Sequence, residues 1–323
     1  MRIDYSEIFA PKPAAVAEIK GRLAAEPVLV PSYVGKPHYA GNFAKQWQQF
    51  RDTQLDSVNG TSISLDFLQQ LLNAPVDTLA DKVVLEIGAG AGRFTEHLVR
   101  HARLVVAIDL SEAIYHNAAL GARNLVAAQA DLFAMPQAKV VFDVVLCRGV
   151  LQHTPSPIEA IGRIHNLVGP GGMVVFDIYR PMRMGRFDAK YIWRPIVQKL
   201  FSYESFAAFL DRNAGRLLKL RWGLKPFLPW KAKRLLDYAI PVWDYKGVYP
   251  LDDRQLIEWC KLDTMDAMFA KFDSPMRYDK VVEAIAGLGA ELVWSDRRMN
   301  FFVSRAKGAP ARAPATMIMA DGS

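Results

Sequence analysis

The sequence predicts an α/β protein with a doubly wound, mostly parallel sheet of seven strands. Five short apolar runs alternate with helical patterns from residue 82 onward, which is typical of buried parallel strands joined by helices. A glycine-rich turn follows the first run directly, as at the ligand-binding edge of such sheets. Two further runs near the C-terminus are close enough to form an antiparallel hairpin. The seven runs are residues 83–87, 104–108, 125–128, 142–146, 173–178, 291–294 and 300–304.

The segments between and around these runs are expected to be helical or irregular. Leu65, Leu68 and Leu72 share one helical face, and a capping Ser156 begins a second clear helix. After the fifth run the alternation stops for about a hundred residues, too long for a loop, so this stretch must contain helices of its own. We therefore expect a helical N-terminal arm (1–80), a core (81–180), a helical lid or substrate insert (181–288), a closing hairpin (289–305) and a disordered tail (306–323).

The composition is that of a folded globular protein. Hydrophobic residues make up 51% of the 323 residues and charged residues 23%, which excludes a disordered or fibrous chain. No apolar run reaches the roughly 18 residues of a membrane span, and the N-terminus lacks signal-peptide order, so we expect a cytoplasmic protein. Cys147 and Cys260 have no Cys or His neighbours at ligand spacing, which predicts neither a disulfide nor a metal site.

The glycine-rich turn carries the strongest functional signal. Gly88, Ala89, Gly90 and Gly92 follow the first strand, where glycine permits positive φ and lets a ligand approach the backbone. A dinucleotide fingerprint would place a small residue at position 93, but Arg93 stands there, so a dinucleotide stays a minor alternative. A plain tight turn is the other alternative. We expect a cofactor to lie against this turn.

Two acids follow the next two strands. Asp109, with Leu110 after it, lies 21 residues beyond Gly88, where a carboxylate can accept hydrogen bonds from ribose hydroxyls. Asp131, with Leu132 after it, ends the third strand. Either Asp alone could be a helix cap, but their joint spacing argues against that role for both. A carboxylate at Asp109 fits either a dinucleotide or an adenosyl ligand.

Glu86 together with the Gly-x-Gly-x-Gly turn resembles motif I of the class I S-adenosylmethionine methyltransferases, and residues 148–155 resemble the segment after the fourth strand in small-molecule members. The resemblance implies a Rossmann-like fold and S-adenosylmethionine as cofactor. It places the methionine part of the cofactor against the glycine turn, with Arg93, Arg148 and Gly149 beside it. It assigns the ribose to Asp109 and the adenine amino group to Asp131.

The resemblance extends less specifically to two flanking segments. Residues 46–57 are expected to close over the cofactor, and residues 262–266 to form part of the acceptor pocket. His153 is the first candidate for a general base, because its loop opens toward the methyl group; the alternative is a structural histidine. Asp263 and Asp266 could act as base or acceptor anchor if that segment is helical, or could cap or face solvent.

The segment 183–234 is strongly basic, with thirteen Lys and Arg against three acids in a chain of net charge +7. It could be a lid, a peripheral membrane face or a single-strand RNA groove. We expect methyl transfer to a small or lipid-like acceptor, at oxygen or carbon. An RNA methyltransferase and a non-catalytic cofactor-binding regulator are the alternatives. The sequence lacks the motifs of DNA-base methyltransferases and leaves the oligomeric state open.

Overall fold

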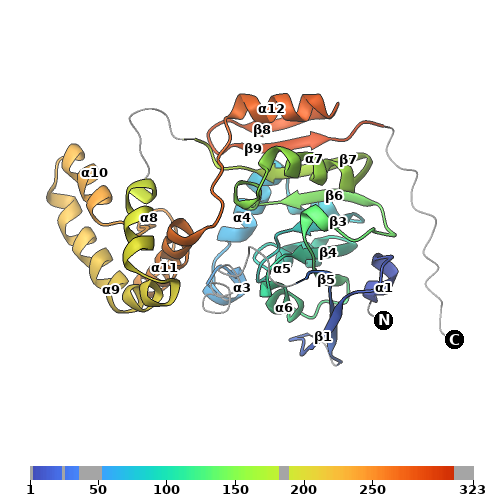
Figure 1. The fold of residues 1–323 in the computed structure, drawn as a ribbon, viewed down its shortest axis with the longest axis horizontal. Helices are drawn as coiled ribbons and strands as arrows, with labels where there is room; N and C mark the ends of the chain where they lie inside the picture. The colour runs from blue at the N-terminus through green and yellow to red at the C-terminus, as the bar shows by residue number, and fades with distance from the viewer. Residues whose placement is uncertain (1–2, 24–25, 36–52, 182–188, 309–323) are drawn as a thin grey trace.

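The computed structural model describes residues 3–23, 26–35, 53–181 and 189–308, and its centre is one nine-stranded sheet (Figure 1). The strand order is β1-β2-β5-β4-β3-β6-β7-β9-β8. The strands are β1 (Ala15–Ile19), β2 (Val28–Ser32), β3 (Val83–Ile87), β4 (Leu104–Asp109), β5 (Leu125–Gln129), β6 (Phe142–Cys147), β7 (Val168–Asp177), β8 (Glu291–Asp296) and β9 (Phe301–Arg305).

The predicted α/β class and the seven predicted strands are confirmed. Strands β3 to β7 are parallel, and every residue of β3 and β5 is buried, as expected for strands covered by helices on both faces. The last two strands form the expected antiparallel hairpin, with β9 paired to β7.

Two strands in the N-terminal arm correct the expectation of an all-helical segment. β1 and β2 pair antiparallel, and β2 extends the sheet beside β5 through Ser32 and Gln129. Neither sequence carries a clear strand signal, because both strands are short, β1 is mostly exposed at the sheet edge, and Pro31 interrupts the apolar pattern of β2. The sheet therefore has nine strands where seven were expected.

Helices cover both faces of the sheet. One apolar layer joins α1, α7 and α12 to the sheet, with Ile161 and Val281 among its buried residues. The opposite layer joins α4, α5 and α6, with Leu68 and Ile114. The helices are α1 (Tyr5–Ile8), α3 (Asp56–Asn59), α4 (Ile63–Leu72), α5 (Thr95–His101), α6 (Ala113–Ala118), α7 (Pro157–Leu167) and α12 (Tyr278–Gly287).

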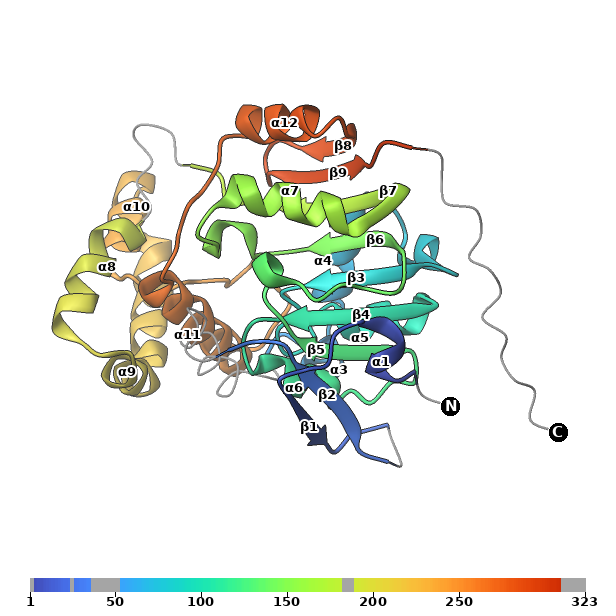
Figure 2. The same cartoon turned by 45° about the vertical axis from the view of Figure 1, so that its right-hand side comes forward.

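Between β7 and α12 the chain forms a helical unit beyond the sheet edge (Figures 1 and 2). It contains α8 (Ala189–Leu200), α9 (Tyr203–Leu224), α10 (Trp230–Ala239) and α11 (Asp253–Phe269). A separate apolar cluster, which includes Phe206, Leu218 and Met268, holds these helices together. We call residues 189–269 the insert. The insert ends earlier than expected, because α12 packs on α7 and β8 and so belongs to the core.

None of the helices within the described ranges is both long and apolar enough to cross a membrane. Two expectations fall mainly outside the described residues. These are the first part of the segment 46–57, up to residue 52, and the tail beyond residue 308.

Candidate active site

A cavity of about 600 Å³ lies at the carboxyl ends of the parallel strands, between the sheet and the insert. In Figure 2 the arrowheads of β3, β4 and β6 point toward the insert, so the loops after these strands meet at this edge. Ten of the twelve residues expected around the cofactor line the cavity: Gly88, Ala89, Gly90, Arg93, Asp109, Leu110, Asp131, Leu132, Arg148 and Gly149.

The glycine turn is held close to its neighbours. The backbone N–H groups of Gly88 and Ala89 both donate to the Ile108 carbonyl, at 2.8 and 3.0 Å. Gly88 has φ +71°, and a Cβ atom there would come within 2.1 Å of the Val150 Cγ2 atom. Only glycine fits this position, and the loop after β6 rests directly on the turn.

Both acids combine a cavity position with a local turn role. Asp109 Oδ2 accepts from Gly90 N at 2.8 Å, and Oδ1 accepts from Ser111 N at 2.7 Å. Asp131 Oδ1 accepts from Phe133 N at 2.9 Å and so caps a short 3-10 helix. Asp109 Oδ1 also accepts from Ser111 Oγ at 2.6 Å, so this carboxylate holds the turn through at least three hydrogen bonds. Because a carboxylate has about four acceptor sites, Asp131 retains capacity for a ligand in the cavity.

The remaining two candidates, Glu86 and Gly92, lie outside the cavity wall. Glu86 is 2% exposed and accepts from Thr95 Oγ1 at 2.5 Å beneath the glycine turn. Burial raises the pKa of Glu86 to about 8, and the neighbouring Asp109 charge adds to the shift. Gly92, at φ +105°, faces Leu120. Both residues therefore lie on the side of the glycine turn that faces away from the cavity, where they can stabilise its conformation.

Two cationic side chains, those of Arg93 and Arg148, line the cavity. The Arg93 guanidinium lies over the rings of Phe94 and Trp259, with its centre 5.1 and 5.5 Å from the ring centroids. Burial lowers the pKa of Arg93 to about 10, and the like charge of Arg148 contributes. The Arg148 guanidinium lies 4.6 Å over Phe67, a wall residue that the sequence analysis missed.

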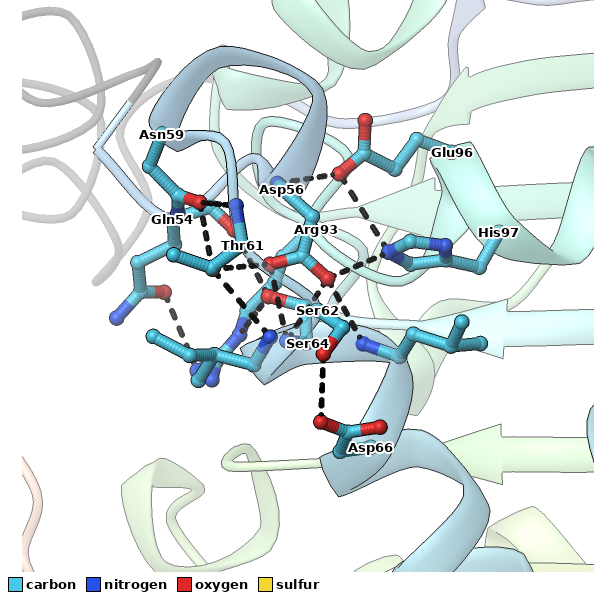
Figure 3. Close-up of polar contacts among 12 residues, drawn as sticks. Gln54, Asp56, Asn59, Thr61, Ser62, Ser64, Asp66, Arg93, Glu96 and His97 are labelled. Carbon is cyan, nitrogen blue, oxygen red and sulfur yellow. Dashed lines mark hydrogen bonds and ion pairs between the residues drawn. The ribbon is translucent and has the colours of Figure 1, made fainter. Parts of the chain in front are cut away.

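A buried polar network places Arg93 (Figure 3). Asp56 accepts from the backbone N–H groups of Ser64 and Leu65, at 3.0 and 2.9 Å, and its Oδ2 lies 3.0 Å from His97 Nε2. Burial opposes ionisation of Asp56, but these hydrogen bonds outweigh it and lower its pKa. Ser64 Oγ in turn accepts from Arg93 Nε at 3.1 Å. The network ties α3 and α4 to the cavity.

Asp56, Glu96 and His97 also bring their ligand atoms within 4.8 Å of one another, a spacing found in metal sites. Here backbone N–H donors already point at the carboxylates: Ser64 and Leu65 donate to Asp56, and Asp56 N donates to Glu96 Oε1 at 2.7 Å. The partial positive charges of these N–H groups would repel a metal cation. The cluster is therefore a buried hydrogen-bond network that connects α3, α4 and α5.

All three candidate catalytic residues meet in the cavity. His153 Nδ1 lies 2.9 Å from the Phe272 carbonyl oxygen, and His153 Nε2 lies 3.9 Å from Asp266 Oδ2. Because a carbonyl only accepts, Nδ1 carries the hydrogen and Nε2 can accept one. Burial raises the pKa of Asp263 to about 6, and Tyr245 donates a hydrogen bond to its carboxylate.

The far part of the cavity is aromatic. Residues from the end of β7, from α11 and from the loop before α11 line it, and we call these side chains the aromatic wall: Tyr179, Trp243, Tyr245, Tyr249 and Trp259. Four of the five residues belong to the insert and Tyr179 follows β7, and no local sequence pattern marks them as a set. Trp259 belongs to α11, which packs against α8 and α9.

Two basic residues of α8 also line the cavity. Lys190 Nζ and Arg194 Nη2 both lie 2.9 Å from Asp273 Oδ2. Burial alone would raise the pKa of Asp273, but the two cations outweigh burial and lower it below its ordinary value. Lys190 Nζ also lies 5.2 Å from the centroid of the Tyr179 ring. In the sequence these residues appear only as part of a basic segment.

Comparison with known proteins identifies the family. The sequence profile described as "Methyltransferase domain" matches residues 85–176. The chain is 31% identical over 161 residues to the ubiquinone biosynthesis O-methyltransferase of Acinetobacter baylyi (strain ATCC 33305 / BD413 / ADP1), covering 45% of this chain and 68% of that protein. It is 29% identical over 197 residues to the enzyme of the same name from Acinetobacter baumannii (strain AYE), covering 56% and 81%.

Among solved structures, the N-methyltransferase NodS from Bradyrhizobium japonicum WM9, in complex with S-adenosyl-L-homocysteine, is 22% identical, with a TM-score of 0.36 over 43% of this chain and 74% of that chain. The chain belongs to the class I S-adenosylmethionine-dependent methyltransferases.

Proposed function

We propose that the chain transfers a methyl group from S-adenosylmethionine to a hydroxyl oxygen of a small, lipid-like acceptor. The observation that carries this proposal is one cavity that joins the glycine turn and the strand-end acids to an aromatic wall and to three ionisable side chains, those of His153, Asp263 and Asp266. The names of the Acinetobacter relatives support an oxygen acceptor and a lipid-like substrate.

The residues at the sheet edge fit the cofactor. Gly88 leaves room that a side chain would fill, and Asp109 and Asp131 offer carboxylate oxygens to hydroxyl and amino donors. Arg93 and Arg148 would face the cofactor carboxylate as cations. When bound, the cofactor supplies a methyl group that its sulfonium charge already activates. The protein therefore needs mainly to orient the acceptor and exclude water.

The aromatic wall would hold the acceptor. Tyr245, Tyr249 and Trp259 present ring surface that packs on an apolar or aromatic molecule. The Asp263 carboxylate, bonded to Tyr245, provides an acceptor for a second hydroxyl of the substrate. At about 600 Å³ the cavity must serve both the cofactor and the acceptor, which limits the acceptor to a small reacting head.

His153 is the proposed general base. Its Nδ1–H donates to the Phe272 carbonyl, which fixes the ring and makes Nε2 the nitrogen that would take the proton of the acceptor hydroxyl. The imidazolium that forms would lie 3.9 Å from the Asp266 carboxylate, whose charge stabilises it. The Val150 side chain of the same loop packs against Gly88, so the proposed base and the glycine turn are held by one loop.

The test uses the purified chain, cofactor labelled in the methyl group, and total bacterial extract separated into lipid, small-molecule, RNA and protein fractions. We expect label in the organic-soluble fraction, on an oxygen by mass spectrometry. His153→Gln should lower the rate about 10²- to 10⁴-fold, the usual contribution of a general base, with unchanged affinity for S-adenosylhomocysteine. His101→Gln, on α5, is the matched control and should leave the rate unchanged.

Other results would contradict the proposal. Label in RNA would favour an RNA methyltransferase. Cofactor binding without label in any fraction would favour a regulatory protein. Equal activity of His153→Gln and the wild type would leave the reaction class intact but remove the proposed base.

A further inference from the structure

The outer end of the insert has an unusual charge distribution. Between Asp211 and Asp237 the chain contains no acidic residue and eight cations: Arg212, Arg216, Lys219, Arg221, Lys225, Lys231, Lys233 and Arg234. At least two of the eight make polar contacts within the insert. Arg221 Nη1 donates to the Val242 carbonyl at 2.8 Å, and Lys225 Nζ lies 3.0 Å from Asp237. The segment 212–236 carries a formal charge of +8, which makes this end of the insert strongly basic.

The same end exposes large apolar side chains. Of the nineteen large hydrophobic residues that are exposed in the described ranges, nine fall between residues 191 and 235. Five of these surround the turn from α9 to α10, and we call them the α9–α10 face: Leu220, Leu224, Phe227, Trp230 and Leu235. Phe227 is 87% exposed, Trp230 69% and Leu235 70%.

The spacing aligns these residues with the cations. Leu220 and Leu224 are one helical turn apart near the end of α9. On α10, Trp230 and Arg234 are four residues apart, as are Lys231 and Leu235, so each apolar side chain shares a side of the helix with a cation. Other side chains of these helices face the rest of the insert. Trp222 donates to Asp244 at 2.9 Å, and Leu236 packs against the apolar cluster of the insert. The exposed face therefore contributes little to folding of the insert, and large apolar groups in water on a basic surface call for another explanation.

We propose that the α9–α10 face docks onto an anionic phospholipid bilayer. Its composition is that of an interfacial surface, in which aromatic and leucine side chains enter the headgroup boundary while Lys and Arg contact anionic headgroups. This inference does not rest on the proposed reaction. It concerns a surface on α9 and α10, whereas the cavity is lined by residues of α8 and α11.

Two other occupants fit the face less well. A single-stranded RNA would stack its bases on rings, but three of the five apolar residues are leucines, which offer no stacking surface. A second copy of the chain would bring two acid-free basic segments together, and this like-charge contact is unfavourable. A lipid surface satisfies both the aliphatic side chains and the cations.

The experiment is flotation of the full chain with vesicles of phosphatidylcholine containing about 30 mol% phosphatidylglycerol, against pure phosphatidylcholine vesicles. We expect binding to the anionic vesicles only. Replacing two cations with Lys231→Gln and Arg234→Gln should weaken binding about thirtyfold, since each cation near an anionic surface contributes about fivefold. Phe227→Ser with Trp230→Ser should weaken it at least about tenfold.

Matched controls change the core instead of the insert. Arg277→Gln with Lys280→Gln removes the same net charge, and Val141→Ser with Val293→Ser removes two exposed apolar side chains. Both should bind like the wild type. Circular dichroism confirms that each variant is folded.

Several outcomes would overturn the proposal. These are equal binding to neutral vesicles, equal losses in the core controls, and no binding to either vesicle. A dimer that Phe227→Ser with Trp230→Ser converts to a monomer would assign the face to a second copy. Salt-sensitive binding of a single-stranded RNA oligonucleotide that the vesicles do not compete would assign it to RNA.

Discussion

Glu86→Gln is expected to change how stability depends on pH. Glu86 is 2% exposed below the glycine turn, and burial raises its pKa to about 8. In the unfolded chain the same carboxyl loses its proton near its ordinary value of 4.5. Between these two values the folded state binds more protons than the unfolded state. The stability of the wild type should therefore fall as pH rises through this window.

The magnitude follows from the size of the shift. The difference of about 3.5 between the two pKa values corresponds to about 5 kcal/mol once both states are ionised, at 1.36 kcal/mol for each unit. Between pH 5 and pH 8 the contribution of Glu86 should fall by roughly 3 to 4 kcal/mol. The glutamine side chain of the variant has no proton to lose, so the stability advantage of the variant over the wild type should grow by this amount.

Urea denaturation of both proteins at pH 5, 6, 7 and 8 measures the effect, with exposed Glu291→Gln as a control that should show almost no pH-dependent difference. At any one pH, the difference in free energy of unfolding between the variant and the wild type also depends on how well the amide packs against Thr95. The change of that difference with pH does not depend on this packing. A difference between Glu86→Gln and wild type that stays constant from pH 5 to pH 8 would refute the reasoning.

Three further predictions concern the turn, the acceptor end and the insert. Gly88→Ala should lose about 1–3 kcal/mol of stability and weaken binding of S-adenosylhomocysteine in calorimetry, because the new Cβ would collide with Val150. Gly149 also has a positive φ but has open space around it, so Gly149→Ala should show the cost of backbone strain alone. Asp263→Asn should gain up to about 3 kcal/mol at pH 7 in denaturation while methyl transfer falls, because a carboxyl with a pKa raised to about 6 is ionised there at a cost. Leu218→Ala should lower insert stability by about 2–5 kcal/mol in thermal unfolding and leave cofactor affinity unchanged below the transition.

The sequence predicted the parts of the site that local rules determine. Glycines follow a strand where the backbone must turn, and acids such as Asp109 and Asp131 end parallel strands, so their convergence follows from sheet geometry. The same rules predicted the position of His153, after β6. These expectations concern which residues meet; their roles in binding and catalysis remain predictions.

Residues that meet through tertiary packing left no such signal. Phe67 reaches Arg148 from α4, and Lys190 reaches the cavity from α8, with nothing in either local sequence to mark them. The strands β1 and β2 were missed because an edge strand needs no buried alternation and Pro31 breaks what pattern there is. The sequence also does not fix the C-terminal boundary of the insert. The helical period of α12 is the same whether this helix packs on the insert or on the sheet.

The insert is held together by an apolar cluster that shares no buried residue with the two layers flanking the sheet. Substitutions at distant positions without shared partners tend to have additive effects on stability. Changes among the side chains of α8 and α11 can thus accumulate without weakening the packing of the sheet and its helices. Such a division would let the far end of the cavity change while the glycine turn stays as it is.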